Sequence, residues 1–98
     1  MVELQIRYKQ LINHLLPAAF TMPVSKNHCF NRIILDWLFK DCWYNHLHRK
    51  PSALSQLSEA QLVYSIQRME LWLIDSALLV DDNRASLLYR TRNKQLSS

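Results

Sequence analysis

The stretch LSEAQL at residues 57–62 is the clearest helix start in this chain. Ser58 is a preferred N-cap residue, and Gln61, three positions later, can bond back to the backbone N–H of Ser58, so the two form a capping box. The flanking leucines are placed to form a hydrophobic staple across the box. The pattern predicts a helix over residues 59–74. Its expected inward stripe consists of Leu62, Ile66, Met69 and Leu73, with Trp72 alongside.

Two earlier segments also show helical periodicity. Residues 4–16 carry apolar side chains at spacings of three and four, and Pro17 is expected to end this helix. Residues 27–47 are apolar around most of the circumference of a helix, which predicts a central helix buried by several neighbours. The expected inward stripe of the first helix consists of Leu4, Tyr8, Leu11, Ile12 and Leu15.

A polar stripe runs along the predicted central helix. Its members repeat every four residues, so they share one face. The simpler interpretation is a solvent-exposed ladder of ion pairs. An alternative is that its aspartate holds an arginine, from the same or another element, in a semi-buried bridge that fixes the register of packing. The stripe consists of His28, Arg32, Asp36 and Lys40.

The region after Ala77 allows two interpretations. Its apolar runs, residues 77–80 and 86–89, flank two adjacent aspartates and an asparagine. The runs can pair as a β-hairpin with a long loop. They can also belong to a further helix capped by Asp81 or Asp82, and we favour this helix. It is expected to bury Ala85, Leu88 and Tyr89.

These segments predict a small all-α protein. We expect a bundle of three long helices plus a C-terminal helix or short β-hairpin. The 98 residues fit a single domain, which we place at residues 1–92, with a polar tail at residues 93–98.

The chain contains no glycine at all, although about seven would be expected at average usage. Glycine-rich phosphate loops, dinucleotide-binding turns and the nucleophile elbow of hydrolases are therefore excluded. Asn-Gly hairpins are excluded as well. The composition favours helices, and we expect the protein to contact its partners through side chains rather than through backbone loops.

Charge and cysteine content are ordinary. Twelve Lys and Arg against eight Asp and Glu give a net charge of +4, which is compatible with an acidic partner but does not require one. Two cysteines do not form a disulfide framework. With no apolar run of membrane-spanning length and no secretory signal, we expect a cytoplasmic protein with no membrane partner.

The histidines and cysteines do not predict a metal or catalytic site. On one rigid helix, the residues at 28–29 and 42–46 lie about 20 Å apart and cannot reach one ion. Cys42 and His46 are close enough to touch, but no turn suited to an oxyanion hole accompanies them. We therefore expect no metal, no cofactor and no enzymatic activity. The residues considered are His28, Cys29, Cys42, His46 and His48.

Two binding functions remain. The leading hypothesis is a small adaptor or regulator that docks on another protein, or on itself, through an aromatic surface with a basic rim, because Trp, Tyr and Arg dominate interface hot spots. Its predicted residues are Phe39, Trp43, Tyr44, Arg49 and Lys50. The alternative is a winged-helix-like nucleic-acid-binding regulator. Its predicted residues are Arg68, Arg84, Arg90, Arg92 and Lys94.

Overall fold

The computed structural model describes residues 2–21, 26–48, 50 and 52–97, and of residues 27 and 93–97 it describes the backbone alone. Every regular element in this part of the chain is helical, as predicted, and there is no strand. The elements are α1 (Val2–Gln10), η1 (Leu11–Leu15), α2 (Leu16–Ala19), α3 (Asn27–Phe39), η2 (Trp43–Asn45), η3 (Leu54–Gln56), α4 (Glu59–Ile74) and α5 (Ser76–Ser97).

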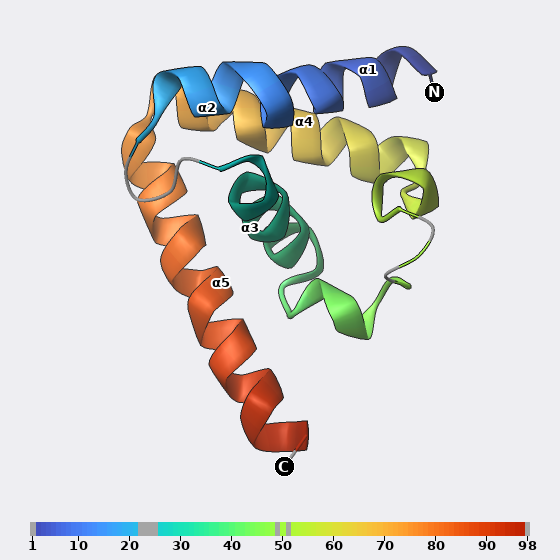
Figure 1. The fold of residues 1–98 in the computed structure, drawn as a ribbon, viewed down its shortest axis with the longest axis vertical. Helices are drawn as coiled ribbons and strands as arrows, with labels where there is room; N and C mark the ends of the chain where they lie inside the picture. Colours follow the sequence, from blue (N-terminus) through green and yellow to red (C-terminus); the bar gives the residue numbers. More distant parts are fainter. Residues whose placement is uncertain (1, 22–25, 49, 51, 98) are drawn as a thin grey trace.

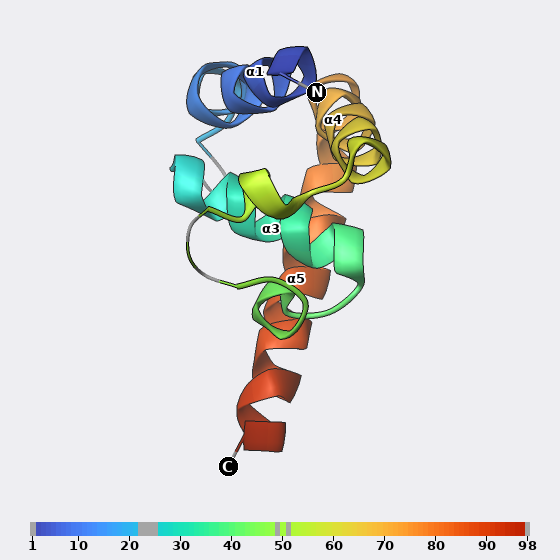
Figure 2. The same ribbon diagram turned by 90° about the vertical axis from the view of Figure 1, so that its right-hand side faces the viewer.

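Helices α1 and α4 run along one direction, and α5 runs across it (Figures 1 and 2). The continuous rod formed by α1, η1 and α2 lies along α4, and α3 packs against both α4 and α5. After α4, the chain turns sharply into α5, whose C-terminal end extends past the other helices. A single core lies among these helices, built around Phe30, Leu62, Met69, Trp72 and Leu79. No helix in the described part of the chain is long and apolar enough to cross a membrane.

The capping box starts α4 as predicted. The backbone N–H of Gln61 donates to Ser58 Oγ (3.2 Å), and the backbone N–H of Ser58 donates to Gln61 Oε1 (2.8 Å). The inward stripe differs at its end, because Leu73 is 39% exposed while Trp72 is fully buried. The indole N–H of Trp72 finds a partner inside the protein, which makes the inward position favourable for it.

The first helix does not end at Pro17. It passes through a π-helical turn, in which the N–H of Leu16 donates to the carbonyl of Leu11, and continues to Ala19. In a regular α-helix the proline ring would collide with the carbonyl four residues earlier, so a wider turn before it avoids the clash. Leu16 therefore follows Leu11 into the core, and the predicted inward residue Leu15 is 38% exposed.

The central helix is shorter than predicted. α3 ends at Phe39, because Lys40 adopts a left-handed conformation with φ of 55°. The N–H of Lys40 donates to the carbonyl of Trp37, and the N–H of Asp41 donates to the carbonyl of Asp36, which is a Schellman ending. The ammonium group of Lys40 lies 4.5 Å from the centre of the Trp37 ring. This cation–π contact helps a residue other than glycine to occupy the position.

The region after Ala77 forms one helix, which decides between the two interpretations. Asp82 does not cap it but lies within it, 7% exposed. Arg68 of α4 donates to both carboxylate oxygens of Asp82 (2.8 and 2.9 Å), and Trp72 Nε1 donates to Oδ2 (2.8 Å). This cluster, the Asp82 clamp, joins α4 to α5.

The inward face of α5 is more polar than expected. Ser86 is fully buried, whereas Leu88, predicted to face the core, is 59% exposed. The helix remains regular through Ser97, across the residues 93–97 that we assigned to a polar tail.

Candidate functional site

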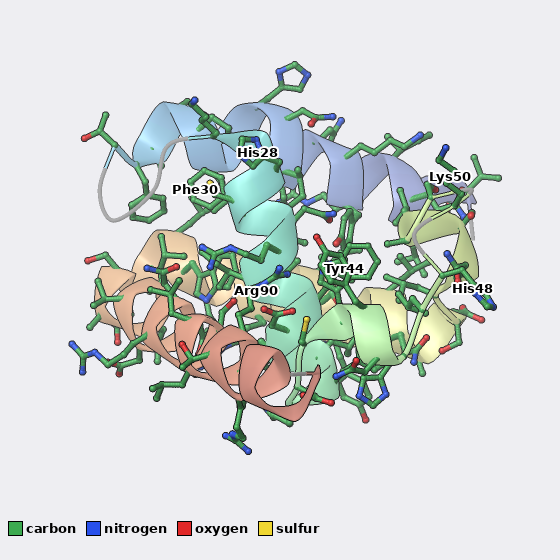
Figure 3. All side chains as sticks on the ribbon, turned by 60° about the horizontal axis from the view of Figure 1, so that its bottom comes forward. His28, Phe30, Tyr44, His48, Lys50 and Arg90 are labelled. Atoms are coloured by element: carbon green, nitrogen blue, oxygen red, sulfur yellow. The ribbon has the colours of Figure 1, made fainter. Side chains whose placement is uncertain are left out.

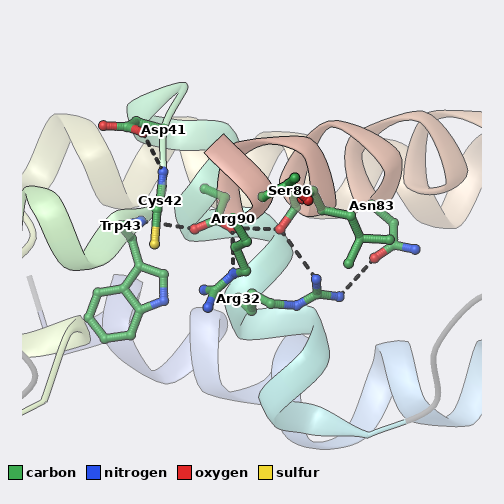
Figure 4. A network of polar contacts seen from close by, with 10 residues as sticks. Arg32, Asp41, Cys42, Trp43, Asn83, Ser86 and Arg90 are labelled. Carbon is green, nitrogen blue, oxygen red and sulfur yellow. Dashed lines mark hydrogen bonds and ion pairs between the residues drawn. The ribbon is translucent and has the colours of Figure 1, made fainter. Parts of the chain in front are cut away.

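Asp36 is the centre of a buried polar network between α3 and α5 (Figure 4). Its Oδ1 accepts the backbone N–H of Trp43 (2.9 Å), and its Oδ2 accepts the hydroxyl of Ser86 (2.5 Å) and Nε of Arg90 (3.1 Å). The carboxylate is completely buried. It therefore ties together α3, η2 and α5, and we call this group the Asp36 network.

A second arginine joins this network without a carboxylate of its own. Arg32 Nη2 donates to Asn83 Oδ1 (2.8 Å), and its Nη1 lies 3.5 Å from Ser86 Oγ. Burial and the neighbouring charge of Arg90 both lower the pKa of Arg32. Two guanidinium groups thus share one carboxylate, and one unit of positive charge is left over.

An aromatic turn adjoins the two arginines. The rings of Trp43 and Tyr44 meet edge to face with centroids 4.5 Å apart, and the guanidinium of Arg90 lies 4.8 Å from the centre of the Tyr44 ring. Burial acts to lower the pKa of Arg90, but its interactions with Tyr44 and Asp36 outweigh burial and raise the pKa. Tyr44 is 38% exposed, so the turn presents an aromatic face to solvent.

A cavity of about 350 Å³ opens between α3, η2 and α5. None of the described residues that line it is acidic. Figure 3 shows Arg90 next to Tyr44, with His28 at the start of α3. The lining residues are His28, Asn31, Arg32, Trp43, Tyr44 and Arg90, and we call this cavity the α3–α5 pocket.

The side chain of Asn31 is oriented by a hydrogen bond from Tyr8, which does not line the pocket. The hydroxyl of Tyr8 donates to Asn31 Oδ1 at 2.6 Å, so the amide nitrogen of Asn31 is the end left for a ligand. Tyr8 is 2% exposed, and burial raises its pKa, so the phenol stays protonated as a donor. With both guanidinium groups, the polar atoms on the pocket wall are mainly hydrogen-bond donors.

The structure brings together only part of the predicted protein-docking surface. Trp43 and Tyr44 lie side by side, whereas Phe39 is half-buried and stacks on His46, with ring centroids 4.9 Å apart. Lys50 is exposed but lies well away from Tyr44 (Figure 3). Arg49 lies outside the described residues. The arginine that contacts Tyr44 is instead Arg90 of α5.

The described residues that were predicted to bind nucleic acid do not form one exposed basic surface. Arg68 is bonded to Asp82 and Arg90 to Asp36, so their charges already serve ion pairs inside the protein. Arg84 and Arg92 are exposed on α5, and the side chain of Lys94 is not among those described. The hairpin that would carry these arginines on a wing does not form in the described chain, so the winged-helix fold was wrong.

The predicted ion ladder on the central helix is also wrong. Asp36 is fully buried and takes its arginine from α5, which agrees with the alternative of a bridge to another element. Arg32 was considered as a ladder member or as the partner of Asp36, and His28 as a possible metal ligand, but neither of them nor Asn31 was predicted to line a pocket. The signal that pointed to the site was an aspartate in an otherwise apolar helix.

The histidines and cysteines do not assemble into a cluster. Cys42 is buried, and His46 lies 3.2 Å from Asp41 at the surface. Hydrogen bonds from Asn45, Cys42 N–H and His46 lower the pKa of Asp41, with the bond from Asn45 contributing most. No group of three or more possible metal ligands occurs among the residues that the structure describes.

No protein-family model, curated protein or solved structure matches this chain significantly.

Proposed function

We propose that this chain is a small, non-enzymatic binding protein that docks on a partner protein through the face formed by Trp43, Tyr44 and Arg90. The observation that carries the proposal is Tyr44 itself, an exposed ring that contacts an indole at 4.5 Å and a guanidinium at 4.8 Å. Tyr, Trp and Arg are the residues most enriched at interface hot spots.

The position of this face supports the proposal because its backbone is held from inside. The N–H of Trp43 is bonded to the buried carboxylate of Asp36, and Arg90 is bonded to the same group. Side chains that are already ordered lose less conformational entropy when they bind, and this improves affinity. The two free cysteines are compatible with a reducing compartment, and we place the protein in the cytoplasm.

A comparison of two tyrosine variants tests this function. Partners enriched by the purified wild-type chain are identified, purified and measured against each variant by calorimetry. Tyr44→Ala is expected to weaken binding about 30-fold, which corresponds to a hot-spot contribution of about 2 kcal/mol. Tyr64→Ala is the matched control, because Tyr64 is 60% exposed on α4 and does not line the pocket.

Three results would contradict the proposal. One is that no partner, including a second copy of the chain, is enriched by the wild type over Tyr44→Ala. Another is that the two variants bind the partner equally well. The last is a loss of helical circular dichroism in Tyr44→Ala, which would make its ring part of the core.

A further inference from the structure

We propose that the α3–α5 pocket receives a phosphorylated side chain of the docking partner, with Arg32 as its main ligand. This inference rests on the proposed function for the source of the phosphoryl group, while the pocket chemistry is argued independently from the contacts of its lining residues.

The charge balance of the pocket is the first reason. Asp36 accepts from Trp43 N–H, Ser86 and Arg90, so its oxygens are occupied by other donors than Arg32. The partners of Arg32 are the uncharged side chains of Asn83 and Ser86. Its positive charge therefore has no direct carboxylate partner in the described structure, and an anion in the pocket would supply one.

An unused donor is the second reason. Nη2 of Arg90 is buried and has no hydrogen-bond acceptor among the described residues. Leaving a buried charged donor without an acceptor costs stability, so such a group calls for a physical explanation. An oxyanion bound in the pocket beside the Tyr44 ring would provide the missing acceptor once the guanidinium turns toward it.

The number and kind of donors favour a phosphoryl group over a carboxylate. Arg32, Arg90 and the amide nitrogen of Asn31 can all donate, and a phosphoryl group offers three strong acceptor oxygens where a carboxylate offers two. His28 and Asn31 lie in the first two turns of α3, where the helix dipole adds a positive field. Arginine clusters are a recurring means of recognising phosphorylated residues.

Titration followed by NMR tests the pocket chemistry on the full chain. The probes are inorganic phosphate, O-phosphoserine, O-phosphotyrosine and acetate, and the signals are the arginine Nε–H groups and the amide of Trp43. We expect saturable shifts with phosphate and the phosphoamino acids at up to about 10 mM, and weaker shifts with acetate. The two phosphoamino acids distinguish a serine from a tyrosine source.

Three variants locate the ligand. Arg32→Gln is expected to weaken phosphate binding about tenfold or more, as for loss of a charge-assisted hydrogen bond. Arg84→Gln is the matched control, because it removes the same charge from an exposed position on α5 and should leave binding unchanged. Asn31→Asp keeps the acceptor for Tyr8 but places a negative charge in the pocket, so it should abolish binding without disturbing the Asp36 network.

Several outcomes would overturn the inference. These are absence of saturable shifts with phosphate, equal weakening by Arg32→Gln and Arg84→Gln, acetate binding as tightly as phosphate, or a short DNA duplex that binds the pocket more tightly than either phosphoamino acid. Binding that persists in Asn31→Asp would also overturn it, even if Arg32→Gln fails to fold.

The two proposals fail in different ways. If partner binding survives phosphatase treatment and Arg32→Gln but is lost in Tyr44→Ala, this inference is wrong and the docking face stands. If the phosphate titrations succeed but Tyr44→Ala binds the partner as the wild type does, the docking face is wrong and the pocket chemistry stands.

Discussion

The Asp82 clamp and the Asp36 network use the same chemistry for different results. Each has a buried carboxylate that accepts from an arginine on another helix and from a neutral N–H donor. In the clamp, Arg68 bonds both oxygens of Asp82, so within this pair one positive charge balances one negative charge. The Asp36 network contains a second arginine, Arg32, so two positive charges share one carboxylate and the net charge is positive.

The difference separates a structural role from a binding role. A balanced, fully hydrogen-bonded ion pair fixes how two helices pack but offers nothing to a ligand. An unbalanced pair needs a counter-charge, and the surplus in the Asp36 network lies beside a cavity. Five substitutions can break or sharpen this distinction.

The largest effect is expected for Asp36→Ala. It leaves two guanidinium groups without a buried counter-charge and removes the acceptor for Trp43 N–H, so we expect a loss of about 3–5 kcal/mol in the free energy of unfolding. Such a loss approaches the whole stability of a small domain. Urea unfolding followed by circular dichroism measures it, and a loss below about 1 kcal/mol would show that the network is not structural.

Asp82→Ala should cost less, about 2–3 kcal/mol, in the same urea experiment. The side chain of Arg68 is 23% exposed and can turn toward water, but the indole N–H of Trp72 would be left buried without an acceptor. If Asp82→Ala were more damaging than Asp36→Ala, the clamp would be the dominant site of stability and the comparison would be reversed.

Arg32→Gln should change the free energy of unfolding by no more than about 0.5 kcal/mol. The substitution loses the bond to Asn83 but relieves repulsion from Arg90, which is a cause of the lowered pKa of Arg32. Arg68→Gln, which removes a balanced charge, should cost about 1–2 kcal/mol in a parallel measurement. Equal losses in the two variants would mean that Arg32 is a structural cation like Arg68.

The smallest effect is expected for the exposed carboxylate Asp41. Its pKa in the folded protein lies below the ordinary value of 3.8, so its contribution to stability is present above that value and is lost as the pH falls through the lower folded pKa. Asp41→Asn should remove this contribution, which is below about 0.5 kcal/mol for a surface group. Urea midpoints at about pH 7 and about pH 3 check it, and a steeper acid loss in the variant would contradict the sign.

Features set by local chemistry were predictable from the sequence. The capping box at Ser58 and Gln61 needs only residues three apart, and it placed the start of α4 correctly. The absence of glycine correctly favoured an all-helical chain. The same rule misled at Lys40, because the left-handed ending of α3 uses a lysine, and no local pattern marks that residue as a helix terminator.

Features set by tertiary packing were not predictable in this way. Hydrophobic periodicity assumes that inward residues are apolar, whereas α5 turns Asp82, Ser86 and Arg90 inward. Their partners lie on α3 and α4, at least ten residues away in the chain, so their burial follows from pairing rather than from spacing. From the sequence, an arginine partner for Asp36 could therefore be suspected, but the pocket lined by Arg32 and Arg90 could not be identified.

The π-helical turn at Leu11–Leu15 makes the chain sensitive to its length there. With about 3.6 residues per turn, each residue of an α-helix contributes about 100° of rotation. Deleting one residue from this turn would remove the wider turn that keeps Pro17 clear of the preceding carbonyl, and it would rotate everything before the turn out of phase with α4. Tyr8 would move away from Asn31, and the side-chain amide of Asn31 would lose the hydrogen bond that orients it, although no residue that lines the pocket had been changed.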